Sequence, residues 1–149
     1  MILTQRRIGL VGCVNKKVGV PRVAKDLYVS TLFVGRRSYV ERSSDEWWVL
    51  SAKHGLVHPD DVLLPYDETL TKKDRPARRS WSKQVLSAID QRIQPRRGDV
   101  FEIHAGAEYR EFGLLDGLRD RGCVVEIPTE GMPFGVQLRF YKQAREHRL

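Results

Sequence analysis

Three polar residues have side chains suited to a hydrolytic reaction: Asp67, Asn15 and His104. A carboxylate can stabilise positive charge that develops in a transition state, so Asp67, within Pro-Tyr-Asp-Glu, is a candidate for supporting an attacking water, with Glu68 as its rival. Asn15 can position that water or form paired hydrogen bonds, and His104 can donate a proton or hydrogen bond to a leaving group. Each has an ordinary alternative: Asp67 can cap a turn, Asn15 can form one, and His104 can be a hydrogen-bonded core histidine.

Four further residues can contact a base or a phosphate. Lys53 and His54 lie in a predicted turn, where they can contact a phosphate or a base. Tyr66 and Tyr109 can stack on a base that has been extruded from a nucleic acid. For both tyrosines, packing in the core is the alternative.

The histidines do not indicate a metal site. His54 and His58 are four residues apart, but Gly55 and Pro59 exclude the helix that would align them as two ligands. We therefore expect no bound metal and no cofactor.

These candidate residues need a fold that brings them together. The strongest sequence signal for a β-strand of such a fold lies at residues 47–50. Their sequence, Trp-Trp-Val-Leu, is an uninterrupted apolar run typical of a strand covered on both faces. The run stops at residues 51–55, Ser-Ala-Lys-His-Gly. Ligands of open α/β sheets bind at the carboxyl ends of the strands, so polar residues here are candidates by position as well as by type.

The remaining elements follow from hydrophobic periodicity. Residues 54–67 are expected to form an ordered loop without regular structure, because glycine and two prolines interrupt it. Strands are expected at residues 7–13, 100–104 and 123–127, and helices at residues 24–28, 30–41, 74–95, 108–122 and 135–147.

Single residues mark several of these boundaries. Ser30 and Asp74 are predicted N-caps, and Gly122 is predicted to close its helix in a left-handed conformation. Gly55, directly after the buried strand, is predicted to have a positive φ. The arginines of the second helix, Arg36, Arg37 and Arg42, are expected to point away from the core.

The alternation of strands and helices predicts one domain over residues 1–149. Its class is α/β, a three-layer α/β/α sandwich with a four-stranded, mainly parallel sheet joined by right-handed crossovers. In such a sheet the polar residues that follow the strands share one rim. They are Asn15, Lys17, Lys53, His54, Asp67, His104, Tyr109, Thr129 and Glu130.

The charge balance favours a polyanionic partner. The chain has 26 lysines and arginines against 19 aspartates and glutamates, a net charge of +7, which also serves solubility. Two basic helices can contact phosphates without reading sequence, or be ordinary solvated faces. The candidate contacts with DNA are Arg75, Arg78, Arg79, Lys83, Arg139 and Lys142.

The remaining composition predicts a cytoplasmic protein. Cys13 and Cys123 lie far apart in apolar runs, which favours reduced, buried thiols over a disulfide. Cys13 would need a base such as His104 to act as a nucleophile, and a buried structural thiol is the favoured interpretation. No apolar run approaches the roughly 20 residues of a membrane span. We expect a monomer that does not bind membranes.

Several motifs together resemble a YaaA-like group of small bacterial proteins. The segment LSAKHGLVHPDDVLLPYDETL has the order and spacing of a serine, a His-Gly-Leu turn and a Pro-Tyr pair in that group. The start of the chain, GCVNKK followed by DLYVSTLF, resembles a Cys-Ser-x-x-Lys and Leu-Tyr-x-Ser pattern that also occurs in a domain of archaeosine synthases. Val14 departs from the usual serine. HAGAEY and GMPFGVQLRFYK extend the resemblance over nearly the whole chain.

The resemblance implies a fold similar to uracil-DNA glycosylases and an association with DNA or modified bases. Longer YaaA proteins also resemble helix-hairpin-helix DNA binders in a part that this chain lacks, so the basic helices would have to supply DNA binding. The residues that match the family motifs join the predicted substrate-binding set. That set is Cys13, Lys17, Tyr28, Ser30, Ser51, Lys53, His54, Tyr66, Tyr109 and Gln137.

Three classes of function are compatible with these observations. The favoured one is a DNA-binding N-glycosylase that excises a damaged or modified base by hydrolysis. The alternatives are a non-catalytic DNA-binding stress-response protein and an enzyme that acts on free modified nucleotides. Two arginine-rich helices favour a nucleic acid over a free nucleotide, and the polar residues at the strand ends favour catalysis over binding alone.

Overall fold

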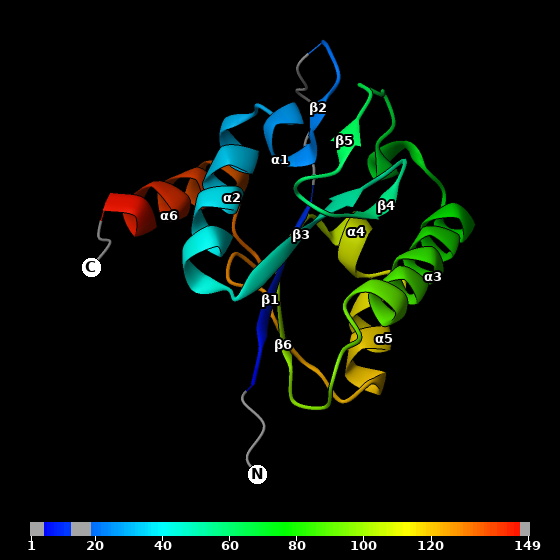
Figure 1. Cartoon of the computed structure of the whole chain (residues 1–149). Helices are drawn as coiled ribbons and strands as arrows, with labels where there is room; N and C mark the ends of the chain where they lie inside the picture. Colours follow the sequence, from blue (N-terminus) through cyan, green and yellow to red (C-terminus); the bar gives the residue numbers. More distant parts are fainter. Residues whose placement is uncertain (1–4, 13–18, 147–149) are drawn as a thin grey trace.

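The computed structural model describes residues 5–12 and 19–146, and these form one mixed β-sheet flanked by helices (Figure 1). The strands of these ranges are β1 (Arg7–Gly12), β2 (Arg22–Val23), β3 (Glu46–Ser51), β4 (Gly55–Val57), β5 (Val62–Leu63), β6 (Val100–His104) and β7 (Val124–Glu126). The helices are α1 (Ala24–Leu27), α2 (Thr31–Ser43), the 3₁₀ turn η1 (Leu70–Lys72), α3 (Arg75–Arg92), α4 (Ala107–Arg110), α5 (Leu114–Asp120) and α6 (Phe134–Glu146).

β1 lies at the centre of a five-stranded sheet with the order β4-β3-β1-β6-β7. It pairs in parallel with β3 and with β6, so that Leu10 lies between Trp48 and Ile103. β7 continues in parallel beyond β6, and β4 pairs antiparallel with β3 at the other side. The carboxyl ends of β3, β1 and β6 therefore lie next to one another, and we call this part of the molecule the carboxyl edge.

The α/β class agrees with the expectation from the sequence, but the predicted number of strands and the predicted loop were wrong. Residues 54–67 contain β4, which adds a fifth strand, and β5, which pairs with β2 in a separate two-stranded ribbon. Gly55 explains β4, because its φ of +71° turns the chain straight back along β3. Leu56 and Val57 are then buried against the sheet, and burial favours a strand over a loop.

The helices cover both faces of the sheet. Figure 1 shows α2 and α6 on one side, and α3, α4 and α5 on the other. Between them, Ile8, Leu10, Val49, Phe101 and Ile103 are fully buried and form the centre of the core. In the portion of the chain that is described, no helix combines the length and the apolar character needed to cross a membrane.

Local sequence signals set most of the helix boundaries. The side chains of Ser30 and Asp74 each accept a hydrogen bond from the backbone N–H three residues later, at 3.1 and 2.9 Å, so both predicted N-caps are confirmed. Gly122 has the predicted left-handed conformation, with φ of +77°. The single helix predicted over residues 108–122 was wrong, because Gly113, at φ of +128°, separates α4 from α5.

Candidate functional site

A cluster of hydroxyl groups lies at the carboxyl end of β3. Ser51 is fully buried, and its Oγ donates to the hydroxyl of Tyr66 at 2.7 Å. The Tyr66 hydroxyl is also hydrogen-bonded to that of Tyr28, which is 2% exposed. The backbone N–H of His54 donates to Ser51 Oγ at 3.0 Å, so the β3–β4 turn fixes the orientation of the serine. Four residues of the predicted substrate-binding set therefore lie together.

Aromatic rings surround this hydroxyl cluster. The ring of His54 meets the ring of half-buried Tyr66 edge-on, with 5.3 Å between centroids. Beneath them, the indole N–H of Trp81 donates to the carbonyl of Ser51 at 2.8 Å, and Trp81 packs edge-on against Tyr109. Tyr109 is only 4% exposed, so core packing accounts for its position, whereas Tyr66 keeps part of its ring accessible.

Charged residues flank the cluster on its outer side. Asp67 follows Tyr66 directly, is exposed, and has no hydrogen-bond or ion-pair partner within residues 5–12 and 19–146. Its rival Glu68 is 3.6 Å from the Lys73 ammonium group. Partial burial, assisted by the cation of exposed Lys53, lowers the pKa of His54, so its imidazole is neutral at pH 7. Among the charged groups described on this side, the Asp67 carboxylate is thus exposed and unpaired.

His104 ends β6 in a fully buried position, where both of its ring nitrogens are hydrogen-bonded. Nε2 is 2.7 Å from an oxygen of buried Glu102, and Nδ1 is 2.6 Å from the hydroxyl of Tyr141 on α6. Glu102 is further held by Arg7 at 2.8 Å and by Ser43 at 3.0 Å. This environment is that of a hydrogen-bonded core histidine, the alternative considered from the sequence.

The protonation of this buried group follows from its surroundings. Burial lowers the pKa of His104 against the opposing effect of Glu102. Burial would raise the pKa of Glu102, but hydrogen bonds from His104 and Arg7 outweigh it and lower that pKa. Glu102 is therefore a carboxylate and His104 a neutral imidazole. Its proton lies on Nε2, facing the carboxylate, and its Nδ1 accepts the hydrogen bond of Tyr141.

Arg36 is a buried residue that reasoning from the sequence missed. It was expected to point away from the core, yet it is 5% exposed. Its Nη1 donates to the carbonyl of Gly12, the last residue of β1, at 3.2 Å, and its Nη2 lies 3.5 Å from Oε1 of Gln137. Arg36 lies four residues from both Leu32 and Val40, which are buried, and this helical spacing was the available signal.

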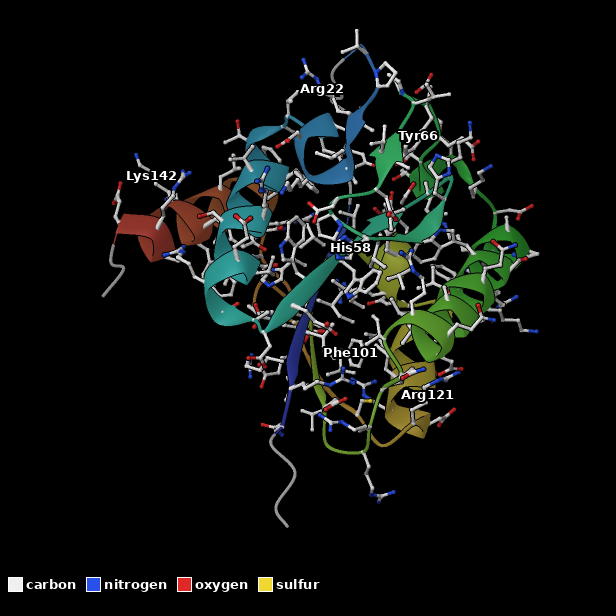
Figure 2. All side chains as sticks on the ribbon, in the orientation of Figure 1. Arg22, His58, Tyr66, Phe101, Arg121 and Lys142 are labelled. Carbon is white, nitrogen blue, oxygen red and sulfur yellow. The ribbon has the colours of Figure 1, made fainter. Side chains whose placement is uncertain are left out.

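The predicted phosphate contacts fall into two groups. Arg78 is half-buried: it donates to the carbonyls of Leu70 and Thr71 at 2.9 and 3.1 Å, and its guanidinium lies over the Phe112 ring, 5.0 Å from the centroid. It therefore fixes η1 instead of facing solvent. The others are exposed, Arg75, Arg79 and Lys83 on α3, and Arg139 and Lys142 on α6. Figure 2 shows Tyr66 near β5 and Lys142 on α6, on opposite flanks of the sheet.

Three predicted residues, Cys13, Asn15 and Lys17, lie outside the described residues. Ser30 lies at the N-terminus of α2, where its Oγ is engaged as the cap. Within residues 5–12 and 19–146, no group of three histidine, cysteine or acidic side chains could hold a metal ion. Among the described residues, the candidate site consists of the hydroxyl cluster and Asp67.

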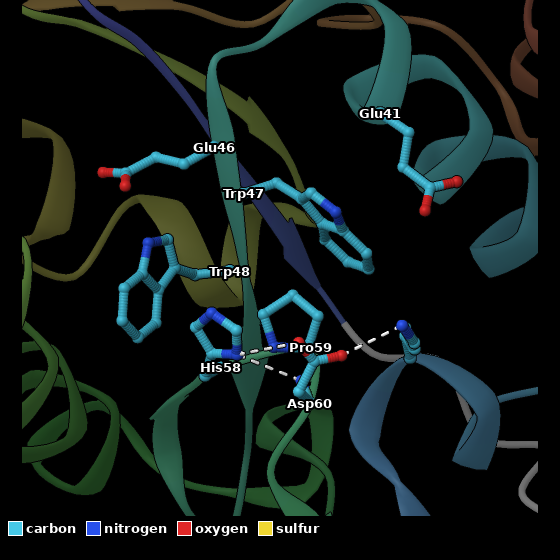
Figure 3. Close-up of a pocket in the computed structure, with 8 residues that line it drawn as sticks. Glu41, Glu46, Trp47, Trp48, His58, Pro59 and Asp60 are labelled. Atoms are coloured by element: carbon cyan, nitrogen blue, oxygen red, sulfur yellow. Dashed lines mark hydrogen bonds and ion pairs between the residues drawn. The ribbon is translucent and has the colours of Figure 1, made fainter.

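A cavity of about 220 Å³ lies at a different place, the outer side of β3 (Figure 3). Trp47 and Trp48 line it next to Pro59. β4 pairs only with Val49–Ser51, so it does not cover this part of β3. The Asp60 carboxylate in the wall is 2.9 Å from the Lys25 ammonium group, which lowers the pKa of Asp60. Because this carboxylate is already paired, the cavity is a weaker candidate for acid–base chemistry than the carboxyl edge.

Comparison with known proteins places this arrangement in a family. The chain belongs to DUF6884, a family of unknown function whose pattern matches residues 8–143. It is 34% identical over 144 residues to the uncharacterized protein YfjM of Bacillus subtilis (strain 168), an alignment that covers 92% of this chain and 87% of YfjM. No solved structure matches the chain.

Proposed function

We propose that the protein is a DNA-binding N-glycosylase that excises a damaged or modified base by hydrolysing its N-glycosidic bond. The observation that carries the proposal is the position of Asp67, an exposed carboxylate directly beside the Ser51–Tyr66–Tyr28 hydroxyl cluster. The motif resemblance to YaaA-like proteins, with the uracil-DNA-glycosylase-like fold and archaeosine-synthase link that it implies, supports the same reading.

The cluster can supply the parts that base excision needs. An extruded base requires a surface to stack on, and the partly accessible ring of Tyr66 offers one beside the His54 ring. Hydrogen bonds with Ser51 and Tyr28 hold the Tyr66 hydroxyl, so the ring is fixed before substrate arrives. A base held there would place its sugar near Asp67, whose negative charge would stabilise the oxocarbenium-like transition state.

The exposed basic residues of α3 and α6 would hold the nucleic acid. Arg75, Arg79 and Lys83 leave their charges in solvent, where they can contact phosphates without reading sequence. We further propose that the protein works in the cytoplasm, as a monomer and without a metal or cofactor.

The decisive experiment compares the Asp67→Asn variant with the wild type in single-turnover assays on oligonucleotides that carry a panel of modified bases. We expect base excision to fall by about 10²–10³-fold, because the lost charge acts only in the transition state. DNA affinity should be unchanged or slightly higher, since a negative charge near a polyanion is removed. Glu68→Gln tests the rival carboxylate, and Asp116→Asn, an exposed change on α5, is the matched control.

Two results would contradict the proposal. If Asp67→Asn excises bases as fast as the wild type, Asp67 has no catalytic role. If its excision rate falls only together with its melting temperature, Asp67 has a structural role. An absence of abasic sites across the whole panel, with DNA binding intact, would favour a non-catalytic DNA-binding protein.

A further inference from the structure

A cavity of about 180 Å³ lies between α2 and α6. The two helices approach closely at Gly35, where an added Cβ would lie 2.9 Å from the Cβ of Tyr141. Helices that pack at an angle diverge on either side of their closest point. The cavity occupies the space beside this point, and Thr31 of α2 and Leu138 of α6 both line it. Thr31 is also the first residue of α2, so the positive end of that helix dipole lies at the cavity.

Among the described residues, three cationic side chains and no carboxylate line this cavity. Arg139, Lys142 and Arg145 follow one another at three-residue intervals on α6, so they lie along one side of that helix. All three are exposed, and their side chains have no hydrogen-bond or ion-pair partner within residues 5–12 and 19–146. The cavity beside Trp47 and Trp48 differs, because three carboxylates line it. The cavity between α2 and α6 therefore suits an anion.

The inner wall of the cavity is apolar and held in place. Gly35 and Tyr141 are buried there, and Leu138 is half-buried. The Tyr141 hydroxyl is hydrogen-bonded to Nδ1 of His104 at 2.6 Å, which fixes the orientation of the tyrosine ring. The cavity is smaller than the roughly 300–1,000 Å³ of sites for drug-sized ligands. It therefore has room for one flat ring system, while the rest of a ligand stays outside among the cations.

We infer that this cavity binds a nucleotide, with the base against Leu138 and Tyr141 and the phosphate held by the three cations of α6. A nucleotide joins a flat ring to a phosphate, and arginine side chains both pair with phosphates and stack on bases. Lys142 and Tyr66 lie on opposite flanks of the sheet, so this site is separate from the hydroxyl cluster (Figure 2). The nucleotide can belong to a DNA strand, where the inference rests on the proposed function, or be free in solution.

The first experiment titrates a 5′-mononucleotide into isotopically labelled protein, with inorganic phosphate as a partial probe. The mononucleotide should shift the Leu138 methyl and Gly35 amide resonances together with the Nε–H resonances of Arg139 and Arg145. Inorganic phosphate should shift only the arginine resonances, and its affinity should be lower by about tenfold because it has no base to stack. Leu138 and Gly35 resonances that stay still when the wild type is titrated with the mononucleotide would overturn the inference, whatever the folding of the variants.

The second experiment tests the cations and the apolar wall separately. Combining Arg139→Gln with Lys142→Gln removes two charges and should weaken mononucleotide binding by about threefold to 20-fold, as expected for exposed charge pairs. Leu138→Trp fills the cavity and should reduce the affinity for the mononucleotide to that for inorganic phosphate. Arg119→Gln, an exposed change on α5, is the matched control and should bind like the wild type. Unchanged mononucleotide affinity in the charge variant, or in a Leu138→Trp variant that keeps its melting temperature, would overturn the inference.

The third experiment identifies the source of the nucleotide by comparing the mononucleotide with a single-stranded oligonucleotide. Shifts of the Leu138 and Gly35 resonances with both ligands support a nucleotide of a DNA strand, and shifts with the mononucleotide alone support a free nucleotide. Nucleotide binding in this cavity without base excision from any modified oligonucleotide would reject the proposed function and keep the inference. Base excision by a protein whose Leu138 and Gly35 resonances respond to neither ligand would do the reverse.

Discussion

His104 shows how burial sets the charge of one side chain and makes stability depend on pH. Its pKa is lowered in the folded protein, so the unfolded chain takes up a proton more readily as the pH falls below about 6.5. The free energy of unfolding should therefore be highest above that pH and fall between pH 7 and pH 5. The lowered pKa of Glu102 extends this loss to lower pH.

The measurement is a set of urea denaturations at pH 7, 6 and 5. His104→Gln should be less stable than the wild type at pH 7, by about 1–3 kcal/mol for a disrupted buried hydrogen-bond pair, and should show a shallower pH dependence. His54→Gln is the comparison, because the pKa of exposed His54 is also lowered, and this variant measures how much of the slope belongs to that residue instead of His104. A His104→Gln variant with the wild-type slope would contradict the assignment.

Gly55 provides a second test at a single residue. Its φ of +71° is a conformation that side chains with a Cβ disfavour, so Gly55→Ala should destabilise the protein by about 1–2 kcal/mol. Space is not the cause, since the nearest atom to an added Cβ would be 3.6 Å away. Thermal and urea melts would measure the change against Gly19→Ala, where φ is not positive and the space is open. Equal melting of the two variants would show that the β3–β4 turn tolerates a Cβ.

Residues whose role depends on the nearest few positions were predictable from the sequence, and residues with distant partners were not. The caps Ser30 and Asp74 and the left-handed Gly55 are set by the adjacent backbone. Arg36 is buried because it meets Gln137, 101 positions away in the chain. The surroundings of His104 likewise depend on Tyr141, and no local pattern contains that information.

At the scale of elements, Arg78 links the start of α3 to η1. Arg78→Ala would leave the carbonyls of Leu70 and Thr71 without this donor and remove the contact with Phe112. We expect a loss of about 1–3 kcal/mol in the free energy of unfolding. Arg79→Ala, the adjacent exposed arginine, should change stability by less than about 0.5 kcal/mol. Chemical denaturation of both variants measures this difference. Equal stabilities would show that the contacts of Arg78 do not stabilise the fold.

The elements that the sequence predicted are those with a long periodic pattern. In the 18-residue helix α3, buried positions recur over several turns. A periodic pattern of this length remains recognisable where a single residue departs from it. β4 and β5 have three and two residues, too few to show an alternation. The division between α4 and α5 depends on one glycine, and a glycine within a helical pattern is compatible with either a break or a continuous helix.

At the scale of the whole molecule, the net charge of +7 predicts DNA binding that weakens steeply as salt is added. Replacing Arg75, Arg79 and Lys83 together by glutamine should weaken binding at low salt. The same change should reduce the slope of log K against log salt by about 2–3 if all three contact phosphates, since each contact contributes roughly 0.7–0.9. Fluorescence titrations at four salt concentrations would measure both effects, with Arg119→Gln on α5 as the control. A salt-independent affinity of the wild type would remove the electrostatic interpretation.

The central position of β1 also decides the order in which the protein can assemble during synthesis. β1 needs β3 on one side and β6 on the other, and its register with β6 joins Val11 to His104. At roughly 5–20 residues per second, β6 leaves the ribosome on the order of 3–10 s after β3 is complete. Throughout that interval one hydrogen-bonding side of β1 has no partner, although the β3–β4 hairpin can already form from local contacts. The growing chain therefore passes through a stage with an open, apolar strand edge, the state in which nascent chains pair with one another or are held by chaperones.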